Sequence, residues 1–205
     1  MSILHAAVLG TLTVLAGCSV GQASSPTSPV AGETAPTFTL PDLDGTSYDL
    51  SSQQGKVVVL EWFNPGCPFV KEAHGPGGGL ATLAKSYTDK GVVWWAVNSG
   101  APGKQGHDPA DNRTAAAEWS MAHPILVDPG GDVGRSYDAK TTPQMVIIDA
   151  EGKLAYNGAF DNAPMGKVKD GERIPYFANA LDQVLAGEEV TVKATKPWGC
   201  SVKYQ

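Results

Sequence analysis

The fold is decided by one stretch of the chain, Lys56-Val57-Val58-Val59-Leu60-Glu61-Trp62-Phe63-Asn64-Pro65-Gly66-Cys67-Pro68. Its first part is almost entirely β-branched, aliphatic or aromatic, which predicts a strand that is buried on both faces at the centre of a sheet. The Cys67-Pro68 pair predicts the start of a helix, because proline suits the first helical position. A cysteine is therefore expected where a buried strand gives way to a helix.

Strand and helix patterns alternate on both sides of this stretch. We predict hairpins over 38–50 and 144–158, a strand over 92–98, and helices over 67–74, 80–90, 112–120 and 176–186. Glycines and a proline at 75–79 interrupt the helical pattern after Cys67, and Asn112 is the expected cap of the helix over 112–120. Helices between strands imply crossover connections. The predicted fold class is α/β, with a central mixed sheet, helices on both faces and an N-terminal hairpin.

Bulk composition limits the classes of function. A chain of 205 residues with 42% hydrophobic and 18% charged residues suits one domain with appended segments. The net charge of -6, without any cluster of Lys and Arg, argues against a nucleic-acid partner. The three cysteines, Cys18, Cys67 and Cys200, are too far apart for a paired zinc-binding spacing.

Cys67 is the candidate nucleophile. The first turn of a helix carries unpaired N–H groups and the positive end of the helix dipole, which favour a thiolate over a thiol. We expect this sulfur to be open to small or extended reactants. A second interpretation of Cys67 with His74, a metal site, has little support because no third ligand lies at close spacing, so His74 is expected to be a helix-end residue.

The segment Glu61-Trp62-Phe63-Asn64-Pro65-Gly66-Cys67-Pro68-Phe69-Val70 resembles the active site of thioredoxin-like redoxins, and most closely the peroxiredoxin-like branch of the alkyl hydroperoxide reductase/thiol-specific antioxidant family. The resemblance covers about residues 33–186. It implies a thioredoxin-like fold and a thiol oxidoreductase without cofactor or metal. It further implies that Cys67 attacks, that Glu61 is a buried acid managing protons, and that Thr142-Pro143 is a cis-proline loop facing the cysteine and an extended substrate.

Two departures from the family patterns affect the expected reaction. Thioredoxins carry a second cysteine three residues after the first, where this chain has Val70. Peroxiredoxins carry a proline seven residues before the cysteine and a Thr or Ser three residues before it, where this chain has Leu60 and Asn64. Thiol-disulfide exchange and peroxide reduction both stay open, with a protein thiol, a protein disulfide or a small peroxide as the partner.

Cys200 is the remaining thiol of the mature chain, and it follows Lys196-Pro197-Trp198-Gly199, a segment that is also similar to the peroxiredoxin-like branch. The residues after Gly187 are long enough to reach back over the sheet. Three interpretations stay open: Cys200 resolves oxidised Cys67 reversibly, it forms a permanent disulfide, or it never meets Cys67.

The N-terminal segment predicts where in the cell the protein is located. An apolar run too short to span a bilayer ends in Leu15-Ala16-Gly17-Cys18, which resembles a bacterial lipobox. We expect a lipoprotein signal peptide at 1–18 with lipid on Cys18, a flexible tether at 19–33, a thioredoxin-like domain at 34–186 and a tail at 187–205. The domain would then face an extracytoplasmic compartment of the bacterial envelope. The alternative is an unprocessed N-terminal helix.

A different class of function also fits the pattern. Without a second cysteine beside Cys67, a thioredoxin fold can bind a peptide or metal through the Cys67 and Pro143 face without turnover. A lowered thiol pKa distinguishes the two, because catalysis requires it and binding does not.

Overall fold

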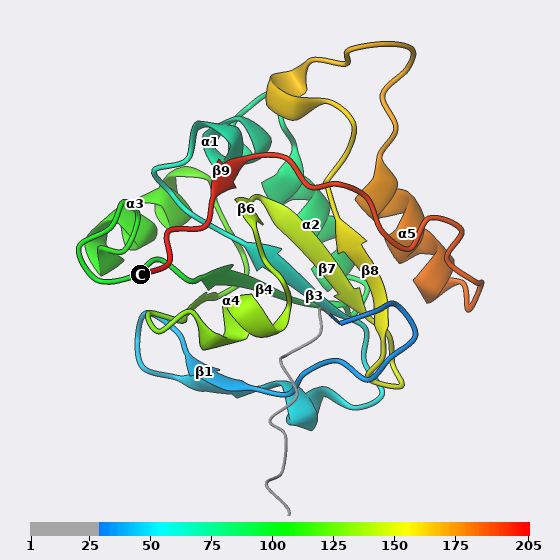
Figure 1. The fold of residues 1–205 in the computed structure, drawn as a ribbon, viewed down its shortest axis with the longest axis horizontal. Coiled ribbons are helices and arrows are strands. Elements are labelled where there is room, and N and C mark those ends of the chain that lie inside the picture. Colours follow the sequence, from blue (N-terminus) through cyan, green and yellow to red (C-terminus); the bar gives the residue numbers. More distant parts are fainter. Residues whose placement is uncertain (1–28) are drawn as a thin grey trace, which may run out of the picture.

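The computed structural model describes residues 29–205, and the expectations for a signal peptide and a lipid on Cys18 lie outside them. A five-stranded mixed sheet forms the centre, in the order β5-β4-β3-β7-β8 (Figure 1). Its strands are β3 (Val58–Trp62), β4 (Val93–Asn98), β5 (Ile125–Val127), β7 (Gln144–Ile148) and β8 (Leu154–Gly158). The central strand β3 runs parallel to β4 and antiparallel to β7, and all its residues are buried, as predicted.

Helices cover both faces of the sheet. The helices are α1 (Pro68–His74), α2 (Leu80–Thr88), α3 (Pro109–Glu118), α4 (Asp132–Ser136) and α5 (Tyr176–Leu185), with short 3-10 turns at Leu50–Gln53 and Pro164–Gly166. One face carries α4 and the predicted N-terminal hairpin of β1 (Thr39–Pro41) and β2 (Ser47–Asp49). Helices α1, α2 and α5 cover the other face.

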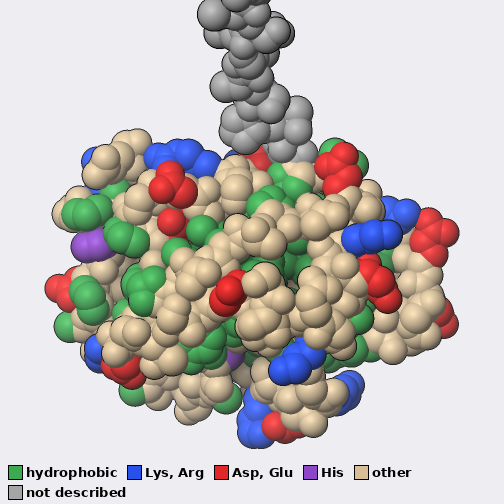
Figure 2. Space-filling model, turned by 90° about the horizontal axis from the view of Figure 1, so that it is seen from below, with side chains coloured by type: hydrophobic (Ala, Val, Ile, Leu, Met, Phe, Trp, Pro, Cys, Tyr) green, Lys and Arg blue, Asp and Glu red, His purple; other side chains and the backbone are tan. Residues whose placement is uncertain are grey.

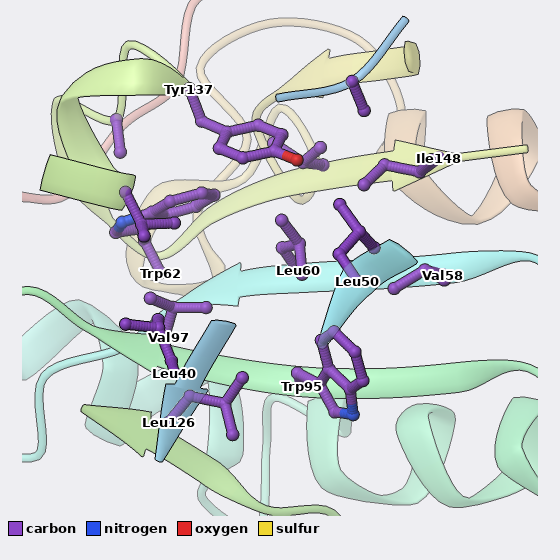
Figure 3. Packing of buried hydrophobic residues seen from close by; sticks show 14 of the residues in the cluster. Leu40, Leu50, Val58, Leu60, Trp62, Trp95, Val97, Leu126, Tyr137 and Ile148 are labelled. Atoms are coloured by element: carbon purple, nitrogen blue, oxygen red, sulfur yellow. The ribbon is translucent and has the colours of Figure 1, made fainter. Parts of the chain in front are cut away.

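Alternation along the strands sends neighbouring side chains into two cores. Leu60, Trp62 and Trp95 pack with Tyr137 under the hairpin, as the close view of this core shows (Figure 3). Val59, on the opposite face of β3, packs against α2 and α5. Burial of both faces accounts for the nearly continuous apolar run in the sequence.

Helix α3 and strand β5 are among the elements that depart from the sequence-based prediction. Helix α3 begins at Pro109, and its cap is Asp108, whose side chain accepts a hydrogen bond from the Ala110 N–H at 2.8 Å. The predicted cap, Asn112, is wrong: it is buried inside the helix, where its amide donates to the Asp108 carbonyl at 2.7 Å. Strand β5 was not predicted, because a three-residue strand is too short to show a hydrophobic period.

Charges of both signs are interspersed on the face shown in Figure 2, without a continuous basic surface. This distribution agrees with the net charge of -6 and with the absence of a nucleic-acid signal in the sequence. Within residues 29–205, no helix combines the length and the apolar character needed to cross a bilayer.

Candidate functional site

Cys67 lies at the junction that the sequence predicted. It is the residue before the first turn of α1, Pro68 occupies the first helical position, and the strand β3 ends at Trp62. The connecting loop is closed by the side chain of Asn64, which accepts from the Gly66 N–H at 2.8 Å, and by the Cys67 N–H, which donates to the Asn64 carbonyl at 3.0 Å. Because these bonds shape the loop, the cysteine is held at the carboxyl end of the central strand.

The end of the chain returns to this site and adds a strand to it. Strand β9 (Cys200–Ser201) pairs antiparallel with β6 (Thr141–Thr142), with Cys200 opposite Thr142. The peptide bond between Thr142 and Pro143 is cis, as the resemblance implied. The tail therefore lies along the loop that was expected to face an extended substrate, and it brings Cys200 to Cys67.

We call residues 190–204 the C-terminal strap, because they run across the sheet from the side of α5 to the side of α3 (Figure 1). Trp198 anchors one side of the strap: its indole N–H donates to the Asp161 carbonyl at 2.6 Å, and its ring centroid lies 5.9 Å from that of Phe69. The Tyr204 hydroxyl anchors the other side by donating to the Ala139 carbonyl at 2.8 Å. The strap is held on both sides of Cys200.

The strap overturns one expectation for Cys67. Its exposed fraction is 0%, so the sulfur is not open to reactants while the strap is docked. Cys200 is partly exposed. The sequence could not show this burial, because the covering residues follow Cys67 by more than a hundred positions.

The two thiols have opposite acidities. Burial raises the pKa of Cys67, but the nearby side chains of Cys200 and Thr142 and the Val70 N–H outweigh burial and leave the pKa of Cys67 below its ordinary value. Partial burial and the neighbouring Cys67 raise the pKa of Cys200 to about 11. Cys67 is therefore the more acidic thiol of the pair, and Cys200 is the one that holds its proton more tightly.

Thr142 contacts Cys67 through two groups. The Cys67 thiol donates to the Thr142 carbonyl at 3.1 Å. The Thr142 hydroxyl is buried and has no hydrogen-bond partner within residues 29–205. Ionisation of Cys67 removes the thiol proton, and the hydroxyl is then a donor available to the thiolate.

Glu61 is completely buried, as expected, and two histidines that the sequence did not assign to the site surround it. His74 Nε2 lies 2.6 Å from one carboxylate oxygen, and the Trp94 indole N–H donates to the other at 3.1 Å. His123 Nε2 lies 3.8 Å from that second oxygen. Burial opposes ionisation of Glu61, but these partners hold its pKa below the ordinary value, while burial lowers the pKa of His123 to about 4. The pair of Glu61 and His74 is thus a buried, polar part of the sheet face beneath α1.

His74 is the last residue of α1, as predicted, but it is also buried and has a partner that the sequence did not indicate. Its ring is stacked on Trp119, with centroids 5.2 Å apart, and it contacts Glu61 instead of solvent. The spacing of seven residues from Cys67 was the available signal, since it places both on one helix face. In the part of the chain that the structure describes, no group of three or more His, Cys, Asp or Glu side chains is placed so that it could hold a metal ion.

Comparison with known proteins gives a consistent picture. A family model described as Redoxin matches residues 30–174. The thiol-disulfide oxidoreductase ResA of Halalkalibacterium halodurans is 30% identical over 124 residues, which are 60% of this chain and 65% of that protein. The chain therefore matches just under two thirds of this relative's length.

Solved structures support the same fold. An uncharacterised conserved protein from Geobacillus kaustophilus superposes with a TM-score of 0.75 and 30% identity, covering 86% of this chain and 93% of that one. The thioredoxin domain of a thiol-disulfide oxidoreductase from Bacteroides vulgatus gives a TM-score of 0.51 and 25% identity, covering 63% of this chain and 89% of that one. The predicted thioredoxin-like fold is confirmed.

Proposed function

Because the chain belongs to the Redoxin family, we propose that it is a thiol-disulfide oxidoreductase whose redox pair is Cys67 and Cys200. The observation that carries this proposal is the hydrogen-bonded contact between a low-pKa cysteine and a high-pKa cysteine. Cys67 supplies the nucleophilic thiolate, and Cys200 is the sulfur with which it forms a reversible disulfide. Cys200 thus takes the place of the second active-site cysteine that Val70 replaces.

A reversible bond is favoured over a permanent one. Both cysteines are free thiols in this structure, and the fold is complete without their bond. The strap is already docked by hydrogen bonds from Trp198 and Tyr204. The disulfide is therefore not needed to hold the tail against the domain.

Disulfide exchange is also favoured over peroxide reduction. Asn64 stands where peroxiredoxins have a hydroxyl, and its amide is used to hold loops together. Its Nδ2 donates to the Gln105 carbonyl at 3.2 Å, and its Oδ1 accepts from Gly66. The amide therefore has little freedom to orient a peroxide beside Cys67.

Glu61 is proposed to manage protons during the exchange. A cavity of about 650 Å³ borders His74, and Lys71 and Glu118 also line it. His74 lines this cavity and contacts Glu61, so it is the group through which protons would reach the buried carboxylate. In a Glu61→Gln variant, the pH profile of turnover should change; an unchanged profile would remove Glu61 from the reaction.

The experiment that tests the function treats the reduced protein with insulin, as a polypeptide disulfide, and separately with hydrogen peroxide. Mass spectrometry then maps each cysteine. We expect insulin to convert the dithiol to a Cys67–Cys200 disulfide, with insulin thiols released, and we expect repeated turnover when dithiothreitol is present. Thiols that stay reduced with insulin would support the non-catalytic binding module. Faster oxidation by peroxide than by insulin would favour peroxide reduction.

We also propose that the chain acts outside the bacterial cytoplasm, anchored by lipid on Cys18 and separated from the membrane by residues 19–33. The lipobox-like Leu15-Ala16-Gly17-Cys18 supports this proposal, and an oxidising compartment suits a reversible disulfide. Labelled palmitate should enter the wild-type chain in bacteria and should not enter a Cys18→Ala variant. Equal labelling of the two would exclude the anchor.

A further inference from the structure

The two cysteines of the proposed redox pair differ in their exposure to solvent. Cys67 is wholly buried, whereas Cys200 lies on the strap and keeps part of its surface in solvent. A molecule that approaches the docked protein meets Cys200 before it meets Cys67. The order of acidity is the opposite of the order of exposure, because the buried Cys67 is the more acidic thiol.

The strap leaves no room for a substrate segment beside Cys67. Its backbone occupies the edge of β6 through the pairs Thr141 with Ser201 and Thr142 with Cys200. The pairing continues beyond β9, where the Val202 N–H donates to the Lys140 carbonyl at 3.0 Å. An extended peptide cannot pair with this edge until the strap leaves it.

We propose that external thiols and disulfides exchange with this protein at Cys200, and that Cys67 completes each exchange by attacking the Cys200 sulfur from beneath the strap. This inference rests on the proposed function and adds to it the point of entry. It reverses the order that the family resemblance implied, in which Cys67 meets the substrate first.

The steps balance as follows. Cys200 gives its proton to water and attacks a disulfide RSSR, and the leaving RS⁻ takes a proton from water to become RSH. Cys200 now carries a mixed disulfide. The Cys67 thiolate attacks the Cys200 sulfur and expels the second RS⁻, which leaves a Cys67–Cys200 disulfide. The second RS⁻ takes a proton from water, so the substrate disulfide has been reduced to two thiols and the two cysteines have been oxidised to their disulfide.

Regeneration by an external dithiol follows the same route in reverse. The incoming thiolate attacks the accessible Cys200 sulfur, and Cys67 departs as a thiolate. In thiol-disulfide exchange the thiol of lower pKa is the better leaving group. The exposure of Cys200 and the better leaving ability of Cys67 therefore both favour attack on the Cys200 sulfur.

Single-cysteine variants and glutathione disulfide as the probe test this order. Cys67→Ser retains Cys200, and Cys200→Ser retains Cys67 beneath a strap of nearly unchanged shape. Peptide mapping follows glutathione addition with time in both folded variants and in both after unfolding in urea. We expect Cys200 of folded Cys67→Ser to react at least about tenfold faster than Cys67 of folded Cys200→Ser, because access limits exchange. In urea this difference should disappear.

The outcomes separate this inference from the proposed function. Glutathione addition to Cys67 in folded Cys200→Ser at the rate of Cys200 in Cys67→Ser, or faster, would overturn entry at Cys200. The proposed function would survive that result if the wild-type protein still formed its Cys67–Cys200 disulfide. Failure of the wild-type protein to form this disulfide with glutathione disulfide would remove both.

Discussion

Replacing Cys67 with serine is expected to lower the turnover of insulin disulfide reduction by roughly a thousandfold or more, because an alcohol is a far weaker nucleophile than a thiolate. Serine has nearly the same size, and it can keep the hydrogen bond to the Thr142 carbonyl that the Cys67 thiol makes. The loss should therefore appear in activity and not in folding. The measurement is dithiothreitol-dependent turnover, with the free energy of unfolding as the control for structure.

A variant that combines Cys67→Ser with Cys200→Ser tests whether the two cysteines act together. If Cys67 and Cys200 work as one redox pair, each single serine variant already abolishes the catalytic cycle. The double variant should then show no further loss of turnover. Losses that multiply in the double variant would show that the two cysteines contribute independently. That result would contradict a shared disulfide.

The second large effect is expected from Gly199→Ala. A Cβ at Gly199 would overlap the backbone carbonyl oxygen of Thr142, and the φ of Gly199 is 143°, which disfavours other residues. The alanine must therefore push β9 away from β6. If docking weakens by about 2 kcal/mol, the undocked population rises about 30-fold, since 1.4 kcal/mol corresponds to a factor of ten.

Iodoacetamide labelling of Cys67 measures this opening. In a Cys200→Ser background, Gly199→Ala should raise the labelling rate of Cys67 by a similar factor, about 30-fold, when opening limits access. Gly171→Ala is the matched control: Gly171 also has a positive φ, 77°, but its Cβ would meet open space. Equal labelling rates in the two alanine variants would show that the strap does not control access to Cys67.

The fold was largely predictable because its strongest signals are local. The apolar run at 56–63 identified the central strand, and Cys67-Pro68 identified the start of α1. The cap of α3 was also predictable in principle, because Asp108-Pro109 is a good helix start, but the run of alanines at 115–117 favours a helix that starts later. The strand β5 carried too few residues to be found.

The site was predictable only in part, because its chemistry depends on contacts between distant segments. The motif located Cys67, and the structure places Glu61 and the cis Thr142-Pro143 bond as the resemblance implied. That His74 and His123 would both face Glu61 depends on how α1 and the segment before β5 pack, which no local pattern records. Two of the three open interpretations required Cys200 to meet Cys67, and the pairing of β9 with β6, which no local pattern records, brings the two cysteines together.

Cys67 is synthesised before the C-terminal strap, and this order has a consequence for the nascent protein. Cys67 leaves the ribosome about 130 residues before Cys200, and at 5–20 residues per second the delay is on the order of ten seconds. During that interval the C-terminal strap is not yet present to cover Cys67. A nascent chain that stalls before position 200 would leave Cys67 open to stray oxidation or cross-linking, so synthesis of the C-terminal strap is also a step in protecting this sulfur.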